Sequence, residues 1–116
     1  MKDNNVINVK AKAFAVRIIR MYQYLNDEKR EFVLSKQVLR SGTSIGANVR
    51  EGIYGQSKAD FRAKMNIALK EANETEYWLE LLQETDYITK EQFESIHSDN
   101  IELIKLLISI VKSSAN

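Results

Sequence analysis

Apolar residues recur at steps of three and four along most of the chain, which is the spacing of one face of an α-helix. The first such series consists of Ala11, Phe14, Ile18, Tyr22 and Leu25. A polar run, Asn-Asp-Glu-Lys at positions 26–29, interrupts it. The pattern predicts a first helix over about residues 6–25.

The second segment contains a stretch that is unusual for a helix, "LRSGTSIGANVREG" from Leu39 to Gly52. Its glycines, serines, threonine and asparagine are mediocre or poor helix formers and would be ordinary in a loop. Nevertheless, steps of 4, 3, 4, 3 and 4 pass straight through it, at Leu34, Val38, Ser41, Ile45, Asn48 and Gly52. A loop has no reason to keep that period. We therefore predict a helix over about residues 30–54, whose small residues, with Gly42 and Gly46 on an adjoining line, admit a close neighbouring helix.

Two further helices are predicted from their start signals and their apolar stripes. Ser57 with Asp60 three residues later is typical of a helix N-terminus, and it predicts a helix over about 57–86. The apolar and small residues of this helix form the stripe Phe61, Met65, Ala68, Ala72, Thr75, Leu79 and Leu82. Thr89 and Gln92 have the spacing of a capping box and open a helix over about 89–112. Four helices of similar length with short connections predict an all-α, antiparallel up-down-up-down four-helix bundle, with residues 1–116 forming one domain.

The last helix has two apolar lines rather than one. Ile96, Leu103, Leu107 and Ile110 form the first line, and Ile101, Ile104, Ile108 and Val111 form the second. A surface helix of a single bundle needs only one such face. The second face predicts contact with another subunit, and therefore a homo-oligomer.

Composition supports this fold and narrows the chemistry. The 116 residues include no proline and no cysteine, so tight hairpin signals, disulfides and thiolate metal sites are absent from the sequence. The N-terminal residues contain no hydrophobic run, and no stretch is long and apolar enough for a membrane span. We expect a cytoplasmic protein that does not bind a membrane.

Several polar residues fall on or beside the helical stripes, where buried groups need hydrogen-bond partners. We expect Glu74 or Thr75 of the third helix to be the partner of Asn48. The predicted structural polar network joins the second and third helices and consists of Ser41, Ser44, Asn48, Glu51, Glu74 and Thr75.

The net charge of +1 conceals two unequal halves. Residues 1–70 contain 14 Lys and Arg against 6 Asp and Glu, whereas residues 71–116 contain 3 against 10. Such a basic half is compatible with a surface that binds nucleic acid. It is equally compatible with basic helices that pack beside acidic ones in the same or a neighbouring subunit.

Lysines and arginines with interleaved tyrosines on the first three helices are the candidates for a nucleic-acid surface, because cations contact phosphates and aromatic rings stack on bases. The candidate nucleic-acid-binding residues are Lys10, Lys12, Arg17, Arg20, Lys29, Arg30, Lys36, Arg40, Arg50, Lys58, Arg62 and Lys64. Tyr22, Tyr24 and Tyr54 are the interleaved aromatics. Nothing in their spacing indicates reading of a particular base sequence.

Catalytic and metal chemistry find little support in the sequence. A di-iron bundle needs two Glu-x-x-His motifs, and Glu94-Ser-Ile-His97 is the single instance because His97 is the only histidine. The segment from Gly52 to Lys58 lacks the spacing of a phosphate loop. Glu51 and Glu74 could form an acid–base pair, but structural hydrogen bonding explains them more simply. We expect no enzyme activity, no metal, no cofactor and no small-molecule substrate.

Two segments resemble the 23S rRNA-intervening-sequence family of four-helix-bundle proteins. The family's S-I-x-x-N-x-x-E-G core corresponds to Ser44, Ile45, Asn48, Glu51 and Gly52. A later run corresponds to Ala72, Asn73, Glu74, Thr75, Tyr77, Trp78 and Leu79, although Asn73 stands where the family commonly has Ser. Lys70 and Glu71 likewise stand where Gly-Ser is common.

The resemblance implies a fold and a kind of partner. Related proteins include the accessory variability determinants of diversity-generating retroelements, which are basic pentamers that bind nucleic acid and a reverse transcriptase. By resemblance, this chain is expected to form a ring-like homopentamer and to bind RNA, DNA or a nucleoprotein partner such as a reverse transcriptase. The alternative is a homo-oligomeric interaction scaffold that binds no nucleic acid, in which basic and acidic helices neutralise each other between subunits.

Overall fold

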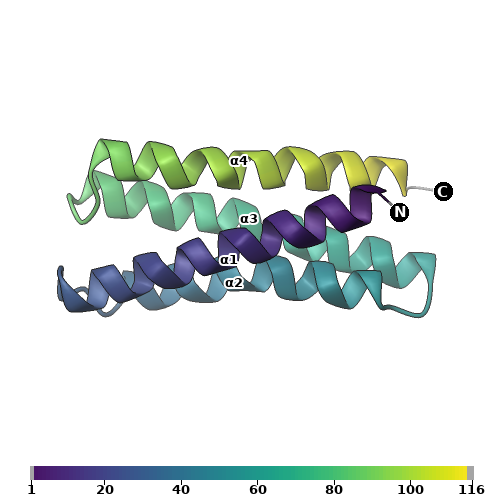
Figure 1. The fold of residues 1–116 in the computed structure, drawn as a ribbon, viewed down its shortest axis with the longest axis horizontal. Coiled ribbons are helices and arrows are strands. Elements are labelled where there is room, and N and C mark those ends of the chain that lie inside the picture. Colours follow the sequence, from purple (N-terminus) through teal and green to yellow (C-terminus); the bar gives the residue numbers. More distant parts are fainter. Residues whose placement is uncertain (1, 115–116) are drawn as a thin grey trace.

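The computed structural model describes residues 2–114, so Met1 and the last two residues of the predicted domain 1–116 lie outside the described part. Its four helices are α1 (Lys2–Asp27), α2 (Leu34–Ile53), α3 (Lys58–Glu84) and α4 (Lys90–Ser113). No strand occurs within residues 2–114, so the all-α prediction is confirmed. The helices lie side by side along a long axis of 45 Å, as Figure 1 shows, and α1 begins at the same end of the molecule at which α4 ends.

The stretch from Leu39 to Gly52 is helical throughout, as its periodicity predicted, and forms most of α2. Its glycines lie where neighbouring helices come close. A Cβ atom on Gly42 would lie 2.6 Å from Cγ1 of Ile18 in α1, and one on Gly52 would lie 3.0 Å from Cβ of Lys64 in α3. The absence of side chains at these two positions therefore allows α2 to approach both neighbours.

The predicted start signals of the last two helices are confirmed. The Ser57 hydroxyl accepts a hydrogen bond from the backbone N–H of Asp60 and caps α3. Thr89 and Gln92 form a complete capping box at α4, with each side chain accepting from the backbone N–H of the other residue. These bonds satisfy N–H groups that have no partner within the helix.

The second helix begins later than expected, at Leu34 rather than at about residue 30. Arg30 has a positive φ of 55°, which no α-helix contains. The Glu31 carboxylate then accepts hydrogen bonds from the backbone N–H groups of Val33, Leu34 and Ser35. Residues 28–33 therefore form a connection that caps α2, instead of its first turn.

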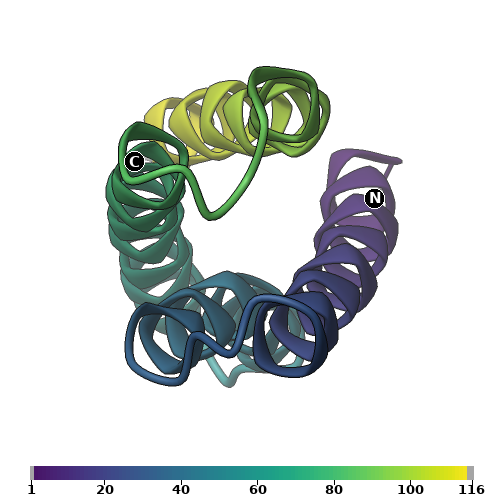
Figure 2. The same ribbon diagram turned by 90° about the vertical axis from the view of Figure 1, so that its left-hand side faces the viewer.

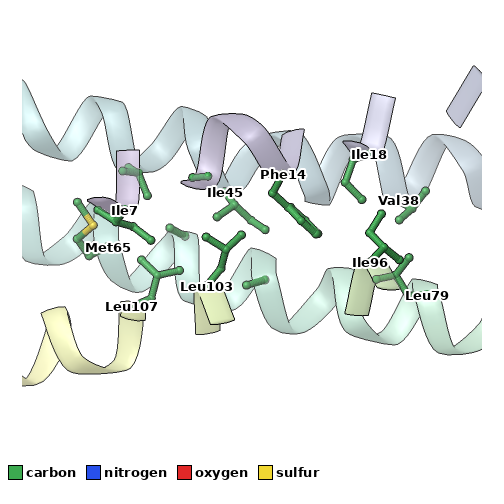
Figure 3. Packing of buried hydrophobic residues seen from close by; sticks show 14 of the residues in the cluster. Ile7, Phe14, Ile18, Val38, Ile45, Met65, Leu79, Ile96, Leu103 and Leu107 are labelled. Carbon is green, nitrogen blue, oxygen red and sulfur yellow. The ribbon is translucent and has the colours of Figure 1, made fainter. Parts of the chain in front are cut away.

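The core is formed by one apolar side of each helix. Figure 2 shows the four helices arranged around a common centre, and Figure 3 shows side chains such as Phe14, Ile45 and Leu103 meeting there. Most of the predicted stripe positions of α1, α2 and α3 are buried, while Tyr22, Leu34, Asn48 and Phe61 are only half-buried. Within the described residues, no helix is both long and apolar enough to span a membrane.

Candidate nucleic-acid interface

The connection between α2 and α3 carries a group of exposed cations. The backbone N–H of Tyr54 donates to the carbonyl of Arg50, and that of Gly55 donates to Gly52, which ends α2. Ser57 then caps α3 only a few residues later. This short turn brings the last turn of α2 and the first turns of α3 to the same end of the molecule (Figure 1).

We define the basic corner as Arg50, Tyr54, Lys58 and Arg62, all of which are exposed. Tyr54 is 78% exposed, which is unusually high for a tyrosine, because tyrosine side chains are commonly half-buried. None of the three cations forms an ion pair within the described residues. The corner therefore presents three cations and one aromatic ring to solvent.

Four of the candidate cations are instead paired with carboxylates of the same chain. Lys10 contacts Glu102 at 3.2 Å, Arg17 contacts Asp99 at 2.7 Å, and Lys64 contacts Glu51 at 3.0 Å. Arg40 contacts both Glu71 and Glu74. Each of these pairs joins two helices, and the carboxylate offsets the positive charge of the cation that it contacts.

The remaining candidates are exposed and form no ion pair within residues 2–114; they are Lys12, Arg20, Lys29, Arg30 and Lys36. Arg30 lies over the ring of Phe32, with its guanidinium carbon 5.5 Å from the ring centroid. Arg20 lines a groove of about 520 Å³ between α1 and α4, which also contains Glu91. Arg17, which also lines this groove, is paired with Asp99, so the groove has one cation without an ion pair in the described residues and the basic corner has three.

One contact joins α2 and α3 within the core. The Thr75 hydroxyl lies 2.9 Å from that of Ser41, and both side chains are fully buried. The Thr75 hydroxyl also lies 2.8 Å from the carbonyl of Glu71. These two predicted network residues therefore meet directly between the helices.

A second contact lies at the surface of the same helix pair. The guanidinium of Arg40 donates to Glu71 and Glu74, and Nε1 of Trp78 donates to Glu74 at 2.9 Å. The Trp78 hydrogen bond, followed by the Arg40 guanidinium, lowers the pKa of Glu74, although burial acts in the opposite direction. The Glu74 hydrogen bond likewise raises the pKa of Arg40.

The rest of the predicted network does not join the two helices in the expected way. Asn48 donates to the carbonyl of Ser44, and Ser44 donates to the carbonyl of Arg40, all within α2. The expectation that Asn48 bonds to Glu74 or Thr75 is therefore wrong. Serine and asparagine side chains within a helix readily bond to the carbonyl one turn earlier, and Asn48 makes this local bond instead of one to α3. Glu51 does reach α3, through Lys64.

His97 contacts α3 rather than the residues of its own sequence motif. Its Nε2 lies 2.7 Å from Oε2 of Glu76, and its ring stacks on Phe93 with centroids 4.7 Å apart. Glu94, the other end of the Glu-x-x-His spacing, is exposed. In the part of the chain that the structure describes, no group of three histidine, aspartate or glutamate residues is arranged to hold a metal ion.

Two structural residues were missed by the sequence analysis. Glu31 caps α2 although no cap residue precedes that helix in the usual position. Asn100 is fully buried on α4 and donates to the carbonyl of Ala72. Its place between Ile96 and Leu103 on the buried line was a signal, because a polar residue on an apolar stripe needs a partner.

Four helices around one core, joined by short connections, are consistent with a protein of the four-helix-bundle class. The chain belongs to the 23S rRNA-intervening sequence protein family, whose sequence model matches residues 2–109. This result confirms the family that the two motifs suggested.

A solved structure agrees with this assignment. It is a protein of unknown function from the S23 ribosomal protein family of Bacteroides thetaiotaomicron VPI-5482. The two chains are 64% identical, the match covers 95% of this chain and 98% of the other, and the TM-score is 0.94. No curated protein matches the chain.

Proposed function

We propose that this protein binds RNA or DNA, free or within a nucleoprotein, through the basic corner and without catalysing a reaction. The observation that carries the proposal is the group Arg50, Lys58 and Arg62, three exposed cations that form no ion pair within the described residues. Such a group of cations suits the phosphate backbone of a nucleic acid. Cations of the protein that contact phosphates displace the counterions condensed there, and the release of these counterions favours binding.

The exposed ring of Tyr54 supports the same proposal. An aromatic ring among cations can stack on an unpaired base while the cations contact the backbone. The ring is at the end of α2, between Arg50 and Lys58 in the sequence, and no core residue covers it. The corner contains no arrangement for reading base edges, so we expect affinity without strong sequence preference.

We further propose that the helices run up-down-up-down and that several copies form a ring-like homo-oligomer, with five the expected number by family resemblance. The contacts of α1 with α4 support alternating directions, since Lys10 pairs with Glu102 and the later residue Arg17 pairs with the earlier residue Asp99. The second apolar line of α4 supports assembly, because Ile108 on it is 39% exposed. A ring would repeat the basic corner and raise affinity for a long polyanion.

A scaffold that binds no nucleic acid is the second candidate. It is favoured by the four basic side chains that acidic residues of α2, α3 and α4 already neutralise. On this reading the charge asymmetry of the sequence serves helix packing, and the oligomer binds a protein partner.

A salt titration distinguishes the two candidates. Fluorescence anisotropy with a labelled structured RNA and a labelled single strand should show binding at about 50 mM salt, with log K falling linearly with log[salt]. Replacing the three corner cations together, as Arg50→Gln, Lys58→Gln and Arg62→Gln, should reduce the magnitude of the slope by about 2 to 3, since each lost phosphate contact contributes somewhat under one.

The matched control removes the same charge at the opposite end of the bundle, as Lys29→Gln, Arg30→Gln and Lys36→Gln. This control should retain most of the affinity and most of the slope. Equal losses in both variants would show that net charge, rather than the corner, governs binding. An absence of binding at about 50 mM salt would leave the scaffold as the function.

A further inference from the structure

The outer side of α1 carries an apolar line that no other helix of the chain covers. Val6, Val9, Ala13 and Val16 recur at steps of 3, 4 and 3, so they share one face of α1. All four are exposed, and Val9 and Val16 are 59% and 48% exposed. Contiguous exposed valines of this kind on a small domain indicate an interaction surface.

A second apolar surface lies along the outer side of α3 and α4. His97 contacts Glu76 of α3, and Ile101, Ile104 and Ile108 continue at helical spacing from His97, so they lie on the side of α4 that faces α3. Tyr77 of α3, next to Glu76, is 53% exposed. This surface and the α1 line are on different helices of the bundle, as Figure 2 shows.

The two surfaces have matching heights along the long axis of the molecule. The Lys10–Glu102 pair sets Val9 within about one turn of Ile104, and the Arg17–Asp99 pair sets Val16 within about one turn of Ile101. The His97–Glu76 contact sets Tyr77 at nearly the height of His97, somewhat more than one turn from Ile101 and close to the height of Val16. A rotation about an axis parallel to the helices keeps every residue at its height.

We propose that the α1 line of one copy packs against the α3–α4 surface of a second copy, with the helices of the two copies pointing the same way. The proposal rests on the homo-oligomer proposed above and assigns the two faces that build it. Val9 then meets Ile104, and Val16 meets Ile101 and Tyr77, so that the two most exposed valines of the line are covered by apolar side chains.

Charge complementarity selects a second copy as the occupant. Arg20 continues the α1 line by one more step of four and is exposed without an ion-pair partner in the described residues. The matching height on the other surface carries Glu80 and Glu94, which are exposed and equally unpaired within residues 2–114. One basic and two acidic groups thus meet beside the apolar contact.

This contact joins two different faces, so it is heterologous, and each copy keeps one free face of each kind until a ring closes. A symmetric dimer would instead bury the same face twice. The two modes give opposite results when complementary variants are mixed.

The experiment uses two exposed pairs, Val9→Lys with Val16→Lys on α1, and Tyr77→Lys with Ile108→Lys on the other surface. In light scattering at micromolar concentration, each double variant alone should have the mass of one chain, 13.4 kDa. An equimolar mixture should give a species of two chains, because each variant retains the face that the other has lost. Circular dichroism checks that both variants remain helical.

Val33→Lys is the control, since Val33 is exposed in the connection between α1 and α2 and lies on neither face. It should keep the mass of the wild-type assembly. A charge swap gives a second measurement: Arg20→Glu should lower the assembled fraction at least several-fold, and Glu80→Lys with Glu94→Lys in the same chain should restore it.

The outcomes separate this proposal from the one on which it rests. A wild-type protein of one chain would overturn the homo-oligomer and the assigned faces together. A wild-type oligomer whose mass the α1 variant leaves unchanged, or a mixture that remains at one chain, would overturn the assigned faces alone. Neither result affects nucleic-acid binding at the basic corner, which the salt titration tests separately.

Discussion

Gly42 illustrates how a single residue sets the distance between two helices. A methyl group there would lie 2.6 and 2.8 Å from two carbons of Ile18, a fully buried side chain. A β-branched side chain in a helix has one strongly preferred rotamer and cannot easily turn aside. Gly46, one turn later, has more room, since its added methyl would lie 3.4 Å from the nearest atom, the carbonyl oxygen of Ala11.

The two glycines therefore predict opposite effects of the same substitution. Gly42→Ala should lower the free energy of unfolding by about 1 kcal/mol, because overpacking exceeds the gain in helix propensity. Gly46→Ala should leave it unchanged or raise it by up to about 1 kcal/mol. Urea denaturation of both variants beside the wild type measures the difference, and equal effects at the two sites would contradict the close α1–α2 contact.

At the scale of one element, the start of α2 depends on a side chain outside the helix. Three backbone N–H groups donate to the Glu31 carboxylate, which is 8% exposed. Val33, in the usual capping position, offers no side-chain acceptor. The carboxylate also lies at the positive end of the helix dipole, which adds to the stabilisation.

Glu31→Ala should therefore lower the free energy of unfolding by about 1 to 2 kcal/mol through the loss of the cap. Glu28→Ala is the matched control, because Glu28 is an exposed glutamate in the same connection whose backbone N–H, rather than its side chain, bonds to Tyr24. Thermal and urea unfolding of the two variants make the comparison. Equal stability of both would exclude a capping role for Glu31.

The contact between α2 and α3 at Glu74 should make stability depend on pH. The Trp78 hydrogen bond and then Arg40 hold the folded-state pKa of Glu74 below its ordinary value of 4.5. A carboxyl group whose pKa is lowered by folding makes its full contribution to stability at pH values above its pKa in the unfolded chain. This contribution is lost as the pH falls through its pKa in the folded protein.

Glu74→Gln should accordingly be less stable than the wild type near neutral pH, and the difference should shrink as the pH falls below about 4.5. Urea unfolding of both proteins at a series of pH values gives the two curves. Glu84→Gln, which removes an exposed glutamate of α3 without an ion pair in the described residues, should show no such convergence. Parallel curves for Glu74→Gln and wild type would contradict the assigned pKa shift.

At the scale of the whole molecule, the basic residues of the first half of the sequence fall into two groups. Lys10, Arg17, Arg40 and Lys64 pair with carboxylates of other helices, whereas the basic corner stays unpaired. The unpaired cations support nucleic-acid binding, and the paired cations support the scaffold. The apolar surfaces of α1 and of α3–α4 consist of other residues than that corner, so assembly and nucleic-acid binding are tested with different variants.

If copies assemble through these surfaces, the midpoint of thermal unfolding should rise with protein concentration, because association stabilises the folded chain by mass action. The variant with Val9→Lys and Val16→Lys should unfold at a midpoint that does not change with concentration. Circular dichroism melts over a hundredfold concentration range test this expectation. A constant midpoint for the wild type would indicate that folding gains nothing from assembly.

The sequence by itself determined the elements of this protein. The spacing of apolar and small residues predicted four helices, including α2 through its glycines, and the motifs of Ser44 to Gly52 and Glu74 to Leu79 indicated the family. These features are local, because helix periodicity and capping depend on residues within a few positions of each other. The stretch from Leu39 to Gly52, which has the composition of a loop, was predictable as helix for that reason.

Only the tertiary structure decided which side chains meet. Asn48 bonds within its own helix, Glu31 caps α2 from the preceding connection, and Arg17 is held by Asp99 while Arg50 remains free of ion pairs in the described residues. Partners such as Arg17 and Asp99 lie far apart in the sequence, and their meeting depends on how the helices align along the bundle. The composition gives the number of charges but not how the helices align, so the basic corner and the two apolar surfaces can be identified only from the packed helices.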